Sequence, residues 1–215
     1  MDDTVNKETF KKPSKIFVIG FNKTGTTSIH KLFKRFQINS VHTIIPVMKI
    51  INKYDAFTDG NHFDFKKYYN RYPDSLFILN TRPIYNWILS RYKHAKKHKF
   101  NNCWCWPPSD IKTSIWVHER ETQYKNVIDF FSDKTEQILI LNIEKDGWER
   151  VLMKFVKNIN TDITLKLNTR DNHTVGCFMK DIINHTNDFL KKNNYTGKEL
   201  LCKEYTDIKN YNTYL

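Results

Sequence analysis

The stretch KIFVIGFNKTGTTSIHKLF, residues 15–33, constrains the possible folds of this chain more than any other. Its first six residues are an apolar run that ends in a glycine, which is typical of a short buried strand. After a polar turn, Ile29, Leu32 and Phe33 repeat at helical spacing. A turn between a strand and a helix presents backbone N–H groups at the helix N-terminus, where they favour an anion. The stretch therefore predicts a phosphate-binding loop.

This loop differs from that of a nucleotide hydrolase in the position of its lysine. A Walker A loop reads G-x-x-x-x-G-K-[ST]. Gly20 and Gly25 keep the glycine spacing, but Thr26 stands at the lysine position and the lysine comes three residues earlier, as Lys23. The three strongest predicted strands also end without the acidic residue that holds Mg²⁺ in a Walker B motif. A small nucleotide or metabolite kinase is therefore the alternative, and a different anion is favoured.

Strands and helices alternate along the rest of the chain, which favours a parallel sheet with helices on both faces. Apolar runs predict further strands over residues 40–45, 76–81 and 137–143, and residues 55–60 form a loop or a strand end. Helices are expected over residues 47–53, 63–72, 83–97 and 147–156, from about Asp110 onward, and around Val175 to Phe189. The expected fold class is α/β: a single three-layer α/β/α domain with a central, mainly parallel sheet, over residues 15–215 after a flexible tail of residues 1–14.

The long helix from Asp110 is predicted to bury an apolar stripe against the sheet. Asp110 itself is expected to cap the helix N-terminus. The stripe is expected to consist of Ile111, Ile115, Tyr124, Val127, Ile128 and Phe131. Residues 101–110, before this helix, are expected to form an irregular aromatic loop.

Composition narrows the classes of function. The net charge is +12, but 28 of the 35 basic residues are scattered lysines, without an arginine-rich block or a zinc-finger pattern. We therefore expect an anionic ligand and no nucleic acid. No apolar stretch approaches the roughly 18 residues of a membrane helix, and the first 15 residues lack a signal core, so a soluble, cytoplasmic protein without membrane contact is expected. The four cysteines, expected to be reduced thiols that bind no metal, are Cys103, Cys105, Cys177 and Cys202.

The run Lys23-Thr24-Gly25-Thr26-Thr27 resembles the 5′-phosphosulfate loop, K-[ST]-G-T-[ST], of the sulfotransferase family. The family's donor is 3′-phosphoadenosine 5′-phosphosulfate (PAPS), whose sulfuryl group is transferred without a metal, leaving adenosine 3′,5′-bisphosphate. The resemblance implies donor contacts from Asn22, Lys23, Thr24, Gly25, Thr26, Thr27 and Ser28.

A second motif of the family fits the stretch LFILNTRPIYNWILSRY. The family's 3′-phosphate site is typically an arginine at a strand end and a serine eight residues later, and Arg82 and Ser90 have this spacing. The planar guanidinium of arginine suits a phosphate because it can donate two parallel hydrogen bonds. Pro83 comes one residue after the arginine, where much of the family has it two residues later. A third stretch, residues 138–156, is similar to the late strand and Gly-Trp helix of small, soluble, bacterial-type sulfotransferases, so the resemblance covers roughly residues 15–157.

The resemblance also implies catalytic roles. Lys23 would neutralise charge on the bridging and sulfuryl oxygens, and a base would take the proton from a hydroxyl or amine acceptor. Asp59 is the first candidate base and His42 the second, with His62 in a similar loop, whereas His30 is expected to be structural. An alternative to catalysis is a decayed nucleotide-binding module.

The chain departs from the family at the adenine and closing-loop positions. Ser28 stands where many members carry a tryptophan that stacks on adenine, and Trp87, Trp104 and Trp106 are candidates for that contact. The arginine-lysine-glycine loop that closes over the donor in cytosolic members is absent, and Arg170 is the candidate to replace it. The loops around residues 42–62 and 98–110 are rich in Lys, His and Trp, which suits a small-molecule or glycan acceptor. The acceptor and the oligomeric state stay open.

Overall fold

The computed structural model describes residues 13–42, 47–59, 64–97, 108–157, 177–201 and 212–214. Its centre is a six-stranded, all-parallel sheet in the order β2-β3-β1-β4-β5-β6. The strands are β1 (Ile16–Val18), β2 (Ser40–Val41), β3 (Ala56–Phe57), β4 (Leu76–Thr81), β5 (Ile138–Asn142) and β6 (Asn212–Tyr214). In the register, Ile78 of β4 lies between Val18 and Leu139.

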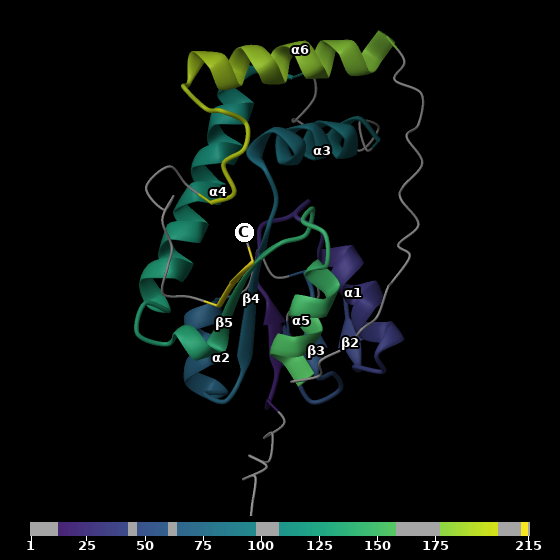
Figure 1. Ribbon diagram of the computed structural model, residues 1–215, viewed down its shortest axis with the longest axis vertical. Helices are drawn as coiled ribbons and strands as arrows, with labels where there is room; N and C mark the ends of the chain where they lie inside the picture. The colour runs from purple at the N-terminus through teal and green to yellow at the C-terminus, as the bar shows by residue number, and fades with distance from the viewer. Residues whose placement is uncertain are drawn as a thin grey trace, which may run out of the picture.

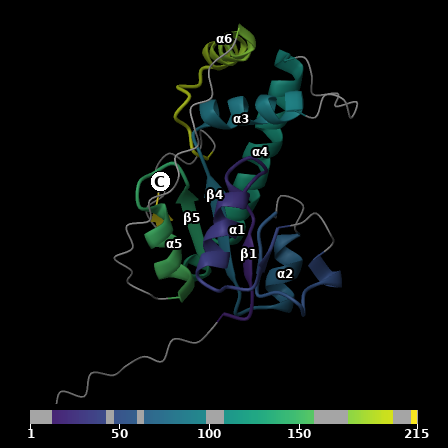
Figure 2. The ribbon, with the colours of Figure 1, turned by 90° about the vertical axis from the view of Figure 1, so that its right-hand side faces the viewer.

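Helices cover both faces of this sheet and its carboxyl edge (Figure 1). They are α1 (Thr26–Arg35), α2 (Phe65–Arg71), α3 (Ile84–Lys97), α4 (Asp110–Phe130), α5 (Trp148–Lys157) and α6 (Cys177–Lys192). A short 3₁₀ turn, Val47–Lys49, follows β2. Figures 1 and 2 show α3 and α6 lying beyond the carboxyl ends of the strands. None of the described helices is long and apolar enough to cross a membrane.

The two faces of the sheet carry separate cores, because successive side chains of a strand point in opposite directions. Phe17 on one face joins Tyr68 of α2 and Tyr124 of α4 in an aromatic-rich cluster. Val18 on the other face joins a cluster with Ile29 of α1 and Leu152 of α5. This arrangement confirms the expected three-layer α/β/α fold with a parallel sheet.

The α4 helix confirms the second half of the predicted stripe, since Tyr124, Val127, Ile128 and Phe131 are buried, and corrects its first half and the predicted cap. Ser109 is the cap residue, since its hydroxyl accepts from the backbone N–H of Lys112, and Asp110 is the first helical residue. Ile111 and Ile115 are 75% and 40% exposed. The buried face is Thr113, Trp116, Val117, Arg120, Tyr124, Val127 and Ile128. Two polar residues continue this face toward the helix start, so an apolar pattern alone selected the wrong positions there.

Three strands, β2, β3 and β6, differ from the strand predictions. β2 is only two residues long before residues 43–46, which lie outside the described ranges. The stretch 55–60 contributes a true strand, β3, between β2 and β1. The sequence did not predict β6, because three residues are too short for a periodic signal. The predictions for His62, Cys103, Trp104, Cys105, Trp106, Arg170 and Cys202, and the side chain of Cys177, lie outside what the structure describes.

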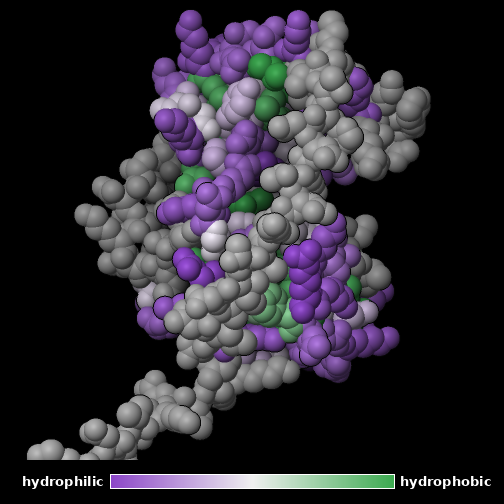
Figure 3. Space-filling view, turned by 45° about the vertical axis from the view of Figure 1, so that its right-hand side comes forward, coloured by the Kyte–Doolittle hydropathy of each residue, from purple (hydrophilic) through white to green (hydrophobic). Residues whose placement is uncertain are grey.

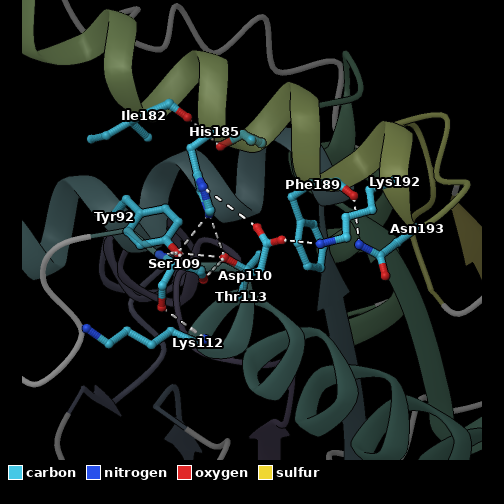
Figure 4. Close-up of polar contacts among 11 residues, drawn as sticks. Tyr92, Ser109, Asp110, Lys112, Thr113, Ile182, His185, Phe189, Lys192 and Asn193 are labelled. Atoms are coloured by element: carbon cyan, nitrogen blue, oxygen red, sulfur yellow. Dashed lines mark hydrogen bonds and ion pairs between the residues drawn. The ribbon is translucent and has the colours of Figure 1, made fainter.

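A polar cluster fastens α6 to α3 and α4 (Figure 4). The Nε2 atom of His185 lies 3.1 Å from the Thr113 hydroxyl oxygen, which is 2.6 Å from the hydroxyl of Tyr92. Lys192 donates to the Asp110 carboxylate at 2.8 Å, and His185 Nδ1 lies 4.0 Å from the same group. Burial lowers the pKa of His185 below its ordinary value, although nearby carboxylates oppose the shift.

Candidate functional site

The loop between β1 and α1 is held from behind by one side chain of β4. Asn80 is fully buried. Its Oδ1 accepts from the backbone N–H of Gly20 at 3.0 Å. Its Nδ2 donates to the carbonyl oxygen of Thr24 at 3.0 Å and to the Thr24 hydroxyl at 2.7 Å. Asn80 therefore fixes both the start and the middle of the loop.

Backbone geometry explains the residues at two loop positions. A Cβ on Gly20 would lie 2.1 Å from the carbonyl oxygen of Asn80, so only glycine allows β1 to end this close to β4. Gly25 has φ 97°, and a Cβ there would lie 2.4 Å from Ile143 Cδ1. The backbone of Lys23 is left-handed as well, with φ 66°. This conformation is energetically unfavourable for any residue that has a Cβ atom. Strain of this kind is concentrated at ligand sites.

The N-terminus of α1 faces the loop without a side-chain cap. Gly25 is the cap residue, and its carbonyl accepts from the N–H groups of Ser28 and Ile29 at 2.9 and 3.1 Å. The first N–H groups of a helix lack intrahelical acceptors and carry the positive end of the helix dipole. Thr26 is buried, whereas Thr27 is exposed at this end. The loop and helix start thus form a surface that favours an anion.

Asn22 anchors the tip of the loop to α3. Its carbonyl oxygen accepts from Trp87 Nε1 at 2.9 Å, and its side-chain oxygen accepts from Arg91 Nη1. Trp87 is fully buried, so it is a core residue that holds the loop and offers no face to an adenine ring. The guanidinium of Arg91 also lies 4.3 Å from the ring centre of Trp116.

Arg82 reaches the loop from the end of β4. Its Nη1 donates to the carbonyl oxygen of Lys23 at 3.2 Å, 59 residues away in the chain. Its Nη2 forms an ion pair with Glu144, whose other carboxylate oxygen accepts from Asn86 Nδ2 at 2.6 Å. Ser90 lies two turns further along α3 and is half-buried. The structure therefore brings Arg82 to the loop.

Arg120 of α4 supports the backbone at this strand end. It is fully buried, and its Nη2 donates to the carbonyl oxygens of Arg82 at 2.9 Å and Leu200 at 2.6 Å. Its guanidinium carbon lies 5.0 Å from the ring centres of Trp87 and Tyr124. Burial against two aromatic rings suits a cation that fixes structure and does not meet solvent.

His42 directly follows β2 and contacts the first turn of α1. Its Nδ1 is 2.9 Å from the carbonyl oxygen of Thr58, and its Nε2 is 3.2 Å from the hydroxyl oxygen of Thr27. A carbonyl oxygen only accepts, so Nδ1 carries the proton and Nε2 of the neutral ring is an acceptor aimed at the loop. The stacked ring of His30, 6.0 Å away, has its pKa lowered by burial and then by His42.

Asp59 lies two residues beyond β3 and is half-buried. It directly follows Thr58, whose carbonyl and hydroxyl oxygens lie 2.9 and 3.3 Å from His42 Nδ1. Asp59 and His42 therefore come from neighbouring strand ends on the same edge of the sheet. Of the two candidate bases, His42 contacts the first turn of α1 through the hydroxyl of Thr27.

A cavity of about 560 Å³ opens beside the first turn of α3. Its lining includes Tyr85, Asn86, Lys191, Tyr195 and Lys198. The Asn86 that lines it is the same residue that binds Glu144.

Figure 3 shows that hydrophilic side chains dominate the described part of one face, with only small, separate hydrophobic areas. Within the described ranges, no three His, Cys, Asp or Glu side chains group as metal ligands would.

Sequence reasoning missed the residues that assemble this site. Asn80 had a visible signal, a polar residue inside the apolar strand LFILNT. Glu144 follows the strand ILILN at the edge where ligand sites form in such sheets, which is also a usable signal. Asn86 and Arg91 had none, since polar residues on a helix are ordinary.

Comparison with known proteins gives one result. Residues 46–134 match the family model of a sulfotransferase domain. No curated protein and no solved structure gives a match. The matched segment contains Asp59, Arg82 and Ser90 but begins after the loop that carries Lys23. Its support for a sulfotransferase family is therefore independent of the loop motif.

Proposed function

Because residues 46–134 match the family model of a sulfotransferase domain, we propose that the protein is a transferase that moves the sulfuryl group of PAPS to a hydroxyl or amine acceptor. The observation that carries the proposal is the hydrogen bond from Arg82 Nη1 to the carbonyl oxygen of Lys23. It joins the 3′-phosphate motif to the phosphosulfate loop, two motifs that the resemblance selected separately. Two anion-binding elements at one sheet edge suit a donor with phosphate at both ends of its ribose.

The donor fits the residues at this edge. The uncapped start of α1 offers the N–H groups of Thr26 and Thr27 to the 5′-phosphate, whereas the Ser28 N–H is bound to the carbonyl oxygen of Gly25. Arg82 and Ser90 would hold the 3′-phosphate. When bound, PAPS supplies an activated sulfuryl group with a good leaving group. Lys23 would neutralise the charge that develops on the bridging oxygen, because fixed charges stabilise an in-line transfer most effectively when they are already in place.

His42 is our candidate for the base, ahead of the Asp59 that sequence reasoning favoured. Its Nδ1 proton is engaged by Thr58, which leaves the Nε2 lone pair directed at Thr27 and the helix start. In this role Nε2 takes the acceptor's proton while the Thr58 carbonyl keeps the ring in one tautomer. We propose that the acceptor is a small molecule or a glycan and that the protein acts in the cytoplasm without nucleic acid or membrane partners.

The test is transfer from PAPS in EDTA to a panel of phenols, monosaccharides, acidic glycans and amines. The proposal expects one bisphosphate released for each sulfated product, and no product from a Lys23→Ala variant that remains folded. Binding of the bisphosphate without turnover on any acceptor class would support the decayed module instead.

One observation favours the kinase alternative. β3 is hydrogen-bonded to the loop strand β1, and Asp59 follows β3, which is a position where a nucleotide kinase carries its magnesium-binding acid. Phosphoryl transfer from ATP that requires Mg²⁺ and is lost in Asp59→Asn would replace our proposal with this alternative.

A further inference from the structure

We infer that Glu144 is an internal competitor of the 3′-phosphate, because its carboxylate holds the hydrogen-bond donors of Arg82 and Asn86 that the phosphate would use. This inference rests on the proposed function. Glu144 would occupy these donors until a stronger anion replaces it. A nucleotide without a 3′-phosphate would leave the ion pair intact and would gain nothing from Arg82.

The fold places Glu144 beside Arg82 through neighbouring strand ends. Thr81 of β4 pairs with Asn142 of β5, so the residues that follow them emerge side by side. The backbone N–H of Glu144 donates to Asn142 Oδ1 at 3.0 Å, and that of Ile143 donates to the carbonyl oxygen of Thr81 at 3.2 Å. The turn thus fixes the backbone of Glu144 next to the end of β4, where Arg82 follows.

The contacts of Glu144 match those that a phosphate needs. One carboxylate oxygen pairs with Arg82 Nη2, and the other accepts from Asn86 Nδ2 at 2.6 Å. A phosphate also presents neighbouring anionic oxygens, for which the guanidinium fork is the usual partner. Two anions close together repel, so phosphate and carboxylate would not share these donors. Binding of a 3′-phosphate is therefore an exchange of one anion for another.

The exposure of the ion pair makes this exchange feasible. The side chains of Arg82 and Glu144 are 20% and 24% exposed, so water and salt screen their attraction. A pair of this kind is weak, whereas a phosphate dianion brings twice the charge to the same cation. Releasing Arg82 from Glu144 should raise the affinity for a 3′-phosphate by roughly three- to tenfold.

The experiment compares Glu144→Gln with Asp146→Asn by titration calorimetry at low salt. Asp146→Asn is the matched control, because it removes one negative charge from the same turn and leaves the Arg82–Glu144 pair in place. The probes are adenosine 3′,5′-bisphosphate and adenosine 5′-monophosphate, which differ only in the 3′-phosphate. Melting temperatures without ligand verify that both variants are folded.

The inference predicts that Glu144→Gln binds the bisphosphate roughly three to ten times more tightly than wild type and binds the monophosphate within about twofold of wild type. Asp146→Asn should bind both probes as wild type does. Unchanged or weaker bisphosphate binding in Glu144→Gln overturns the inference, and so does an equal gain for both probes. If wild type fails to bind the bisphosphate at all, the proposed function falls and this inference with it.

Discussion

The side chain of Asn80 binds Thr24 at two points, its carbonyl oxygen at 3.0 Å and its hydroxyl at 2.7 Å. With its Oδ1 on the Gly20 N–H, Asn80 satisfies three buried polar groups of the loop from a neighbouring strand. The loop is therefore held in shape by β4, and its geometry depends on this one amide.

Asn80→Asp should destabilise the protein strongly. A carboxylate has no N–H to offer the Thr24 carbonyl, so the change buries two acceptors against each other together with a charge. We expect a loss of about 3 kcal/mol in the free energy of unfolding, measured by urea denaturation at neutral pH. The control is Asn39→Asp, which removes one exposed hydrogen bond from Asn39 Nδ2 to the carbonyl oxygen of Lys53 and should cost less than about 1 kcal/mol. Equal losses in the two variants would show that Asn80 does not hold the loop.

Lys23→Gly should separate stability from activity. Lys23 has φ 66°, which glycine adopts without strain, so the free energy of unfolding should stay within about 1 kcal/mol of wild type. Transfer should nevertheless fall by about 100-fold or more, because the cation at the developing charge is lost. Urea denaturation and a transfer assay on the same preparation provide the two values. Retained transfer would exclude Lys23 from the chemistry.

His42→Gln should reduce kcat by about 100-fold or more and leave donor affinity nearly unchanged. Glutamine can still hydrogen-bond to Thr58 but cannot accept a proton at neutral pH. The matched variant is Asp59→Asn on the next strand, for which we expect a change of less than about fivefold. The reverse order of effects would identify Asp59 as the base, as the sequence had suggested.

Acid should weaken the attachment of α6. The pKa of His185 is lowered below its ordinary value of 6.5 by burial, with Asp110 and Asp188 opposing. The unfolded chain has the higher pKa at this histidine, so it is protonated at a higher pH than the folded chain. The free energy of unfolding therefore falls as the pH decreases below about 6.5. His30, with its pKa also lowered by burial, contributes in the same direction.

His185→Gln should accordingly flatten the pH dependence of stability between about pH 7 and pH 5, measured by urea denaturation. The titratable groups that face His185 are Tyr92 of α3, Asp110 of α4 and Asp188 of α6, and Lys192 binds the same Asp110. His30→Gln should remove a separate part of the slope. An unaltered slope in His185→Gln would mean that this histidine carries the same charge in both states.

Local signals in the sequence predicted the loop and the fold class, and contacts between distant strands could not be predicted. An apolar run followed by helical spacing was enough for β1, the loop and α1, because these patterns involve neighbouring residues. Asn80 meets Gly20 only because β4 lies next to β1, and Glu144 meets Arg82 only because β5 lies next to β4. On α4, the buried face includes the polar residues Thr113 and Arg120, which an apolar pattern cannot select. Thr113 is buried because it binds Tyr92, and Arg120 because it binds the carbonyl oxygen of Arg82 at the end of β4.

The central claim, a donor site for PAPS, is tested most directly by a thermal-shift titration with adenosine 3′,5′-bisphosphate in EDTA. A ligand that binds only the folded state raises the melting temperature by mass action. We predict a rise of several degrees at millimolar bisphosphate for wild type, a much smaller rise for Arg82→Ala, and no added effect of Mg²⁺. No shift with the bisphosphate, together with a shift with ATP that requires Mg²⁺, would contradict the account.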